Sequence, residues 1–95
     1  MAKPREIDLH LHAFRRNTSG MSAEAMLNFS IDRMRAALED AIDRGEREIH
    51  FIHGHGKGAL RDRVYRELQT YVRDGEIQSY EASFFNPDIV VVRIQ

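Results

Sequence analysis

Apolar and polar residues alternate strictly over residues 6–12, EIDLHLH. The three aliphatic side chains fall on one side of an extended chain, and the acidic and imidazole side chains fall on the other. A period of two over this length is typical of a strand with one buried face. The polar face of this predicted strand carries Asp8, His10 and His12.

The pattern then changes to a helical spacing, which predicts a first helix from Ser22, as N-cap, to about Arg44. Gly45 follows at the position where a glycine commonly ends a helix. The apolar stripe of this helix consists of Leu27, Ile31, Met34, Leu38 and Ile42. A second helix is predicted over residues 59–74, again followed by a glycine, Gly75. Its stripe consists of Leu60, Val64, Leu68, Tyr71 and Val72.

Three further strands are predicted at residues 47–53, 77–84 and 89–94, with a turn at 86–88 between the last two. The last strand is apolar on both faces, so we expect it inside the sheet. The order β-α-β-α-β-β defines an α/β fold. Right-handed crossovers place both helices on one face of the sheet. The other face stays open, and there we expect the polar side chains of the first strand and His50.

Composition limits the classes of protein to consider. The chain has 95 residues and no cysteine, which predicts one domain over 1–95, excludes disulfides and fits a cytoplasmic location. Residues 1–5 read as a flexible linker, so the domain can be a fragment of a longer chain. No apolar run reaches the ~20 residues that a membrane span needs. The net charge of −1 means that any nucleic-acid binding must rely on local basic positions.

The segment Gly54-His55-Gly56-Lys57-Gly58 lies between a predicted strand and a predicted helix. Backbone N–H groups at such a helix start favour a bound phosphate, and Lys57 and Arg61 add positive charge. The alternative is a tight turn that needs its glycines only for backbone angles. The segment is not a P-loop, because Lys57 is followed by Gly58 rather than by serine or threonine.

All five histidines lie in two short clusters, at positions 10, 12, 50, 53 and 55. The first two strands are expected to be parallel neighbours, so their ends should bring the clusters to one edge of the sheet. A carboxylate beside an imidazole, as in Asp8 and His10, orients the ring and stabilises its charged form, which suits acid–base chemistry. His10 and His12 have the spacing of a metal-binding pair, but no histidine follows residue 55, and we predict no metal site. The alternative for His12 is an exposed polar residue at a strand end.

Together these residues resemble the small MutS-related (Smr) domain. That family pairs an Asp-Leu-His motif at the end of its first strand with a Gly-x-Gly loop after its second strand. The matching residues are Asp8-Leu9-His10 and His53-Gly54-His55-Gly56-Lys57-Gly58, followed by Ala59, Leu60, Arg61 and Val64. The resemblance covers nearly the whole chain. It implies a two-layer α/β sandwich whose mixed four-stranded sheet has its last strand between the second and the third.

The resemblance also implies a function. Smr domains are associated with binding and nicking DNA and with cleaving RNA, including messenger RNA on stalled ribosomes. RNA or DNA is therefore the expected partner, with ribosome association as one setting, no membrane partner, and a monomeric isolated domain. The predicted catalytic residues are Asp8, His10 and His55. The predicted nucleic-acid and phosphate contacts are Arg15, Arg16, His53, Gly54, Gly56, Lys57, Gly58 and Arg61.

Three departures from the family pattern leave two functions open. Leu11 stands where the family usually has glycine, the first loop is long and carries Arg15 and Arg16, and residues 84–88 read FFNPD instead of Gly-Gly-x-Gly. The first function is an endonuclease, which needs no metal if the 2′-hydroxyl of RNA is the nucleophile. With DNA, Mg²⁺ or Mn²⁺ is the expected cofactor, and no organic cofactor is expected in either case. The second is a non-catalytic nucleic-acid-binding module.

A third reading is a protein-interaction domain that uses the open sheet face. Ile52, Phe84 and Phe85 would then contact the partner. Their ordinary alternative, a place in the core, is the interpretation that the sequence favours.

Overall fold

The computed structural model describes residues 3–10, 19–54 and 58–95. The elements are β1 (Arg5–Asp8), α1 (Ala23–Asp43), β2 (Glu48–Ile52), α2 (Ala59–Arg73), β3 (Ser79–Ala82) and β4 (Ile89–Arg93). Their order is the predicted one. Both helices lie close to their predicted bounds. The first strand begins at Arg5 and its pairing ends at Asp8, so it is shorter than the alternation suggested.

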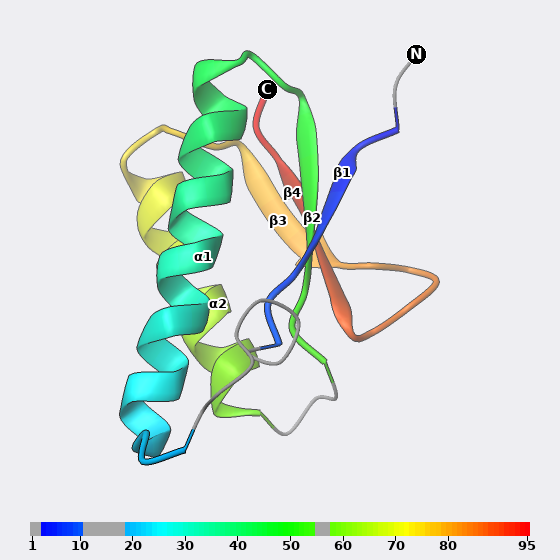
Figure 1. Cartoon of the computed structure of the whole chain (residues 1–95). Helices are drawn as coiled ribbons and strands as arrows, with labels where there is room; N and C mark the ends of the chain where they lie inside the picture. The colour runs from blue at the N-terminus through cyan, green and yellow to red at the C-terminus, as the bar shows by residue number, and fades with distance from the viewer. Residues whose placement is uncertain (1–2, 11–18, 55–57) are drawn as a thin grey trace.

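The four strands form one mixed sheet in the order β1-β2-β4-β3. β1 runs parallel to β2, whereas β4 runs antiparallel to both of its neighbours. Both helices cover the same face of this sheet (Figure 1). The predicted two-layer α/β sandwich and the internal position of the last strand are confirmed.

The core lies between the helices and one face of the sheet. Each central strand contributes alternate residues, Ile49 and Phe51 from β2 and Val90 and Val92 from β4, all fully buried. The helices contribute Ile31, Met34 and Leu38 from α1 and Val64, Leu68 and Tyr71 from α2. Burial of each large apolar side chain contributes roughly 1.5–3 kcal/mol. The same alternation leaves His50 half-buried on the opposite face, as predicted.

The expectation of core positions for Phe84 and Phe85 is wrong. Their side chains are 93% and 91% exposed. β3 ends at Ala82, before the end of its predicted range of 77–84. The chain then leaves the sheet in a hairpin that is closed by a 2.8 Å bond from the Ser83 N–H to the Ile89 carbonyl. Both phenylalanines follow the last paired residues, so no neighbouring strand or helix covers them.

Two hydrogen bonds from α1 hold the end of β1. The Ser30 hydroxyl donates to the Leu9 carbonyl at 2.7 Å, and Arg33 Nε donates to the Asp8 carbonyl at 2.9 Å. Ser30 is only 3% exposed, so its hydroxyl is a buried donor that meets a buried acceptor. These bonds fix the position at which the chain leaves the sheet after β1.

His53 is the other buried polar residue among those described, with 4% of its surface exposed. Its Nδ1 lies 3.0 Å from the Gly54 carbonyl, and its ring meets the edge of Tyr65 at 5.9 Å between centroids. Burial lowers the pKa of His53, and the charge of Arg61 acts in the same direction, whereas the Gly54 carbonyl opposes the shift. The neutral imidazole is therefore the form that the fold accommodates.

We predict that Ser30→Ala lowers the free energy of unfolding by about 1–3 kcal/mol, because it leaves the buried Leu9 carbonyl without its donor. Urea unfolding followed by circular dichroism measures this change. Ser79→Ala, at an exposed position of β3, is the matched control and should cost much less. Equal effects of the two substitutions would contradict this account of Ser30.

We also predict that stability falls as the pH drops below about 6.5, the reference pKa of histidine. In that range the unfolded chain takes up a proton at residue 53, whereas the folded chain, with its lowered pKa, takes it up only at lower pH. Above about pH 6.5 His53 is neutral in both the folded and the unfolded chain, so its protonation no longer lowers the free energy of unfolding. Unfolding titrations between pH 7.5 and 5.5 should show a smaller slope for His53→Gln than for wild type. Parallel slopes would argue against a buried neutral His53.

Candidate functional site

One edge of the sheet collects the segments that carry most of the predicted chemistry. β1 and β2 are parallel, with Asp8 in register with Ile52, so both strands end at this edge. The segment 83–88, which joins β3 to β4, lies at the same edge, toward the bottom of Figure 1. The structure therefore brings His10 of the first histidine cluster beside Gly54, as the sequence predicted.

Asp8 and His10 form a close carboxylate–imidazole pair. Asp8 Oδ1 accepts a 2.9 Å hydrogen bond from the backbone N–H of His10 and lies 2.7 Å from His10 Nδ1. The two side chains are 43% and 50% exposed, so the pair is open to solvent. An imidazole whose Nδ1–H donates to a carboxylate has its Nε2 lone pair available to accept a proton.

The imidazole of His10 packs directly against the backbone of Gly54. A Cβ atom at residue 54 would lie 2.9 Å from His10 Cε1 and still closer to Nε2. Gly54 also has a φ of +84°, which side-chain-bearing residues rarely adopt. Glycine is therefore required here for two reasons, and the Nε2 atom of His10 faces the first residue of the glycine segment.

Residues 53 and 54 are anchored to the hairpin between β3 and β4. The backbone N–H groups of His53 and Gly54 both donate to the Asp88 carbonyl, at 2.9 and 3.2 Å. His53 was predicted to contact nucleic acid, but its ring lies beneath this segment rather than on its surface. In this position His53 supports the glycine segment through the Gly54 carbonyl.

The start of α2 has features of an anion site. Gly58 is its N-cap and has no side chain to accept hydrogen bonds from the N–H groups of the first turn, which are the donors that bind anions at a helix start. Arg61, also in the first turn, places its guanidinium 5.2 Å from the centre of the Tyr65 ring. The acidic Asp62 shares this turn and lowers its net positive charge.

Several predicted site residues lie outside the described parts of the chain, and their roles stay predictions. These residues are Arg15, Arg16, His55, Gly56 and Lys57. Sequence reasoning missed the Asp88 carbonyl and Arg33, which position the site through the backbone. No sequence pattern marks a backbone acceptor, and Arg33 resembles any surface arginine of an amphipathic helix.

His50 belongs to a different part of the open face. Its Nε2 lies 2.6 Å from Glu48 Oε2, and Arg93 contacts the other oxygen of Glu48 at 3.4 Å. Glu48 is the first residue of β2 and His50 lies in its middle, so both are away from the Ile52 end of the strand, where the Asp8–His10 pair lies. His50 thus forms a second carboxylate–imidazole pair that is separate from the Asp8–His10 pair.

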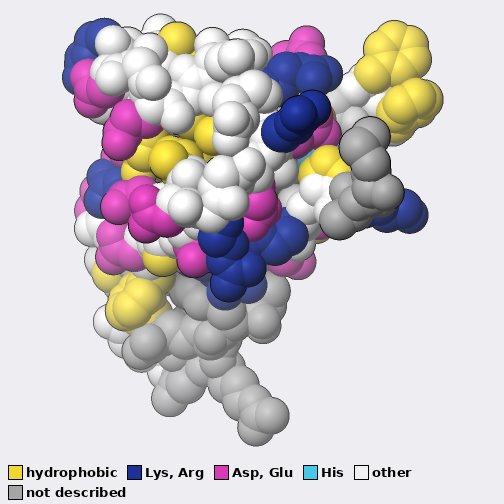
Figure 2. All heavy atoms as spheres, turned by 90° about the horizontal axis from the view of Figure 1, so that it is seen from above, with side chains coloured by type: hydrophobic (Ala, Val, Ile, Leu, Met, Phe, Trp, Pro, Cys, Tyr) yellow, Lys and Arg dark blue, Asp and Glu magenta, His cyan; other side chains and the backbone are white. Residues whose placement is uncertain are grey.

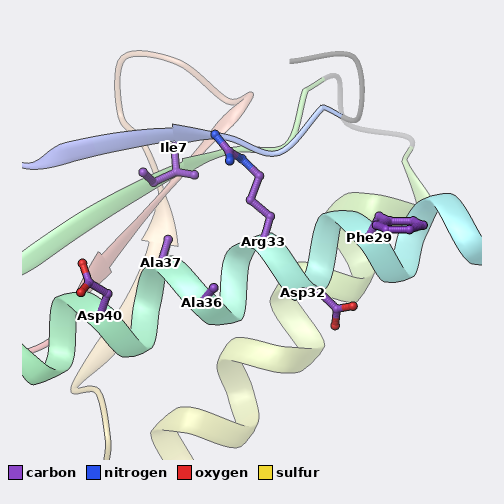
Figure 3. A pocket seen from close by; sticks show the side chains of 7 residues that line it. All are labelled: Ile7, Phe29, Asp32, Arg33, Ala36, Ala37 and Asp40. Carbon is purple, nitrogen blue, oxygen red and sulfur yellow. The ribbon is translucent and has the colours of Figure 1, made fainter. Parts of the chain in front are cut away.

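Two other regions of the surface do not offer comparable chemistry. A hollow of about 550 Å³ along α1 and β1 is lined by Ile7, Phe29, Asp32, Arg33, Ala36, Ala37 and Asp40, without a histidine (Figure 3). The end of the molecule opposite the site mixes acidic and basic side chains (Figure 2). Arg5 there bridges Asp40 and Glu46 at 3.2 and 3.0 Å. These ion pairs neutralise the charges locally.

The described residues contain no group of three or more histidine, aspartate or glutamate side chains arranged to hold a metal ion. None of the helices in this part of the chain has the length and hydrophobicity needed to cross a membrane.

Comparison with known proteins agrees with this architecture. No curated protein matches the chain. The crystal structure of the Smr domain of Thermus thermophilus MutS2 has the same fold, with a TM-score of 0.69 and 23% sequence identity over 96% of this chain and 98% of that chain. A model of the Smr domain family matches residues 9–84, which is most of the sequence. The chain therefore belongs to the Smr domain family.

Proposed function

We propose that this protein binds nucleic acid through its phosphates and cleaves it, with Asp8 and His10 supplying the acid–base chemistry. Smr domains generally bind nucleic acid, and some of them are nucleases. The observation that carries the proposal is the exposed Asp8–His10 pair, whose imidazole packs on Gly54 at the edge of a candidate phosphate site. His10 also lines one hollow together with Ala59 and Leu60 of the first turn of α2, which supports a proton acceptor beside the proposed anion site.

Phosphate binding rests on the start of α2. The first-turn N–H groups and the helix dipole favour a negative charge, and Arg61 adds a full positive charge. Lys57 is expected to contribute as well. Because the net charge of the chain is only −1, repulsion from the rest of the molecule is weak.

RNA is the proposed substrate, because its 2′-hydroxyl can serve as the nucleophile. In this step His10 Nε2 accepts the 2′-hydroxyl proton while the 2′-oxygen attacks the adjacent phosphorus. The bond from phosphorus to the 5′-oxygen breaks, and that oxygen takes a proton from an acid, a role proposed for His55. The products are a 2′,3′-cyclic phosphate and a 5′-hydroxyl. Asp8 holds Nδ1–H and stabilises the imidazolium that forms.

A non-catalytic nucleic-acid-binding module is the second candidate. Residues 84–88 lack the glycines that the family often has before its last strand. In this protein the Asn86 side chain instead caps the turn by accepting a 3.0 Å hydrogen bond from the Asp88 N–H. If close approach of substrate to this segment is needed for cleavage, the anion site remains and the reaction is lost.

We predict that the protein cleaves labelled single-stranded RNA and that His10→Ala reduces the rate about 100-fold or more, as expected for loss of a general base. Asp8→Ala should reduce it as well, because the imidazole then loses its orienting carboxylate. His50→Ala removes the imidazole of the other carboxylate–imidazole pair and is the matched control, with an unchanged rate at saturating RNA. Assays with EDTA, Mg²⁺ or Mn²⁺ determine the metal requirement, and supercoiled plasmid tests DNA as the substrate.

A wild-type protein that binds RNA without cutting it would support the non-catalytic module. Equal rates for wild type and His10→Ala would exclude the proposed acid–base role. Contaminating nuclease is recognised by activity that His10→Ala and Asp8→Ala both retain.

We predict further that Arg61→Ala weakens RNA binding and reduces the slope of log K against log salt by about 0.7, the value for one phosphate contact on a single strand. Arg73→Ala, at the other end of α2, removes the same charge away from the site and should leave the slope unchanged. Fluorescence anisotropy between about 50 and 200 mM salt measures both slopes. Identical slopes for the two variants would show that the start of α2 does not bind phosphate.

A further inference from the structure

Phe84 and Phe85 form an exposed aromatic pair on the hairpin between β3 and β4. Their rings are 5.3 Å apart between centroids and meet edge to face at 81°. Apart from Phe29, at 39%, they are the described large hydrophobic residues that stand out from the surface, at 93% and 91% exposure. A hydrophobic protrusion stands clear of the molecule in Figure 2. Exposed aromatic side chains of this kind need an explanation, because burying each ring would be favourable.

The hairpin is held in place and joined to the proposed phosphate site. Its base is closed by the bond from Ser83 to Ile89, and its turn is capped by Asn86. Its Asp88 carbonyl accepts the hydrogen bonds from residues 53 and 54. Figure 1 shows the hairpin projecting on the side of the sheet away from the helices. The aromatic pair and the glycine segment are thus parts of one connected edge.

The phenylalanines also form one wall of a hollow of about 350 Å³ over the open face of the sheet, with Val91 among its lining residues. Its charged and titratable groups are mostly paired, since Arg93 lies 3.4 Å from Glu48 and 3.6 Å from Glu81, and His50 Nε2 lies 2.6 Å from Glu48 Oε2. Two carboxylates against one arginine disfavour a phosphate in this hollow. A neutral, flat group with polar atoms at its edge is not repelled by these carboxylates. The ion-paired side chains offer it hydrogen-bond donors and acceptors.

We propose that Phe84 and Phe85 are a stacking platform for unpaired bases of a single-stranded nucleic acid whose backbone is held at Gly54 and the start of α2. This proposal rests on the proposed function and adds the substrate class. Bases stack on exposed aromatic rings in a sequence-tolerant way, whereas the faces of bases inside a duplex are already covered by their neighbours. The platform therefore selects single strands over duplexes.

A second copy of this chain is a weaker fit to the same rings. Two aromatic side chains bury roughly 300–500 Å² together, at about 150–250 Å² each. A stable protein interface buries about 800 Å² per partner. Beside Ala82 and the partly buried Val91, the neighbouring surface consists of ion-paired side chains.

The first arm of the test uses the absence of tryptophan from the chain. Phe85→Trp places the only tryptophan of the chain in the proposed platform, and single-stranded RNA should quench and shift its emission. Phe29→Trp, on α1, is the control and should not respond. An RNA that is abasic at the contacted positions should bind Phe85→Trp without the quenching, because it has phosphates and no base to stack.

The second arm measures affinity. The double variant Phe84→Ala/Phe85→Ala should bind single-stranded RNA roughly tenfold or more weakly than wild type, as expected for lost base–aromatic stacking. The two proteins should bind the abasic RNA equally. Because both side chains are more than nine-tenths exposed, the variant should melt at the wild-type temperature.

Failure of this inference is distinguishable from failure of the proposed function. The platform would be overturned if the double variant bound RNA with unchanged affinity and Phe85→Trp showed no quenching. If binding in that case still depended on Arg61, the proposed phosphate site would stand. Absence of any RNA binding by wild type would overturn both. A wild-type dimer that the double variant abolishes, with RNA binding unchanged, would assign the rings to a second copy of the chain and overturn the platform.

Discussion

Parallel pairing of β1 with β2 determines where the chemistry of this protein lies. Two parallel neighbours end at the same edge of a sheet, so the residues that follow them meet in space although more than forty positions separate them in the chain. Here that geometry places His10 against Gly54. Each supporting contact refines this arrangement: α1 holds the end of β1 through Ser30 and Arg33, and Asp88 holds residues 53 and 54.

The core is built from alternate residues along the strands, whereas the site is built from the residues at the strand ends. Alternate residues of β2 and β4 point toward the helices and are fully buried, and these residues supply the apolar stabilisation. The site lies where the strands end, and there the main contributors are backbone groups and two exposed side chains. His53 differs from the two exposed side chains, because its ring is buried and its Nδ1 also contacts the Gly54 carbonyl. It is the residue through which the packing of the core reaches the glycine segment.

Most of the fold followed from the periodicity of the sequence, because burial imposes that periodicity. The apolar stripes identified both helices, and the two apolar faces of residues 89–94 identified a central strand. The Asp8–His10 pair was predictable since residues two apart share a strand face. The exposure of Phe84 and Phe85 was not predictable, because alternation does not show where pairing stops. The role of the Asp88 carbonyl was equally hidden, since every residue carries such a group.

The two outer strands of the sheet are short and charged. β1 and β3 have four residues each, and both carry carboxylates, whereas the apolar strands β2 and β4 lie between them. Arg33 Nε also donates a hydrogen bond to the Asp8 carbonyl at the end of β1, so this acceptor already has a partner. Unpaired strand edges are templates for aggregation, and short edges with charges resist the addition of a further strand. Short charged outer strands therefore oppose strand addition between molecules that also expose an aromatic hairpin.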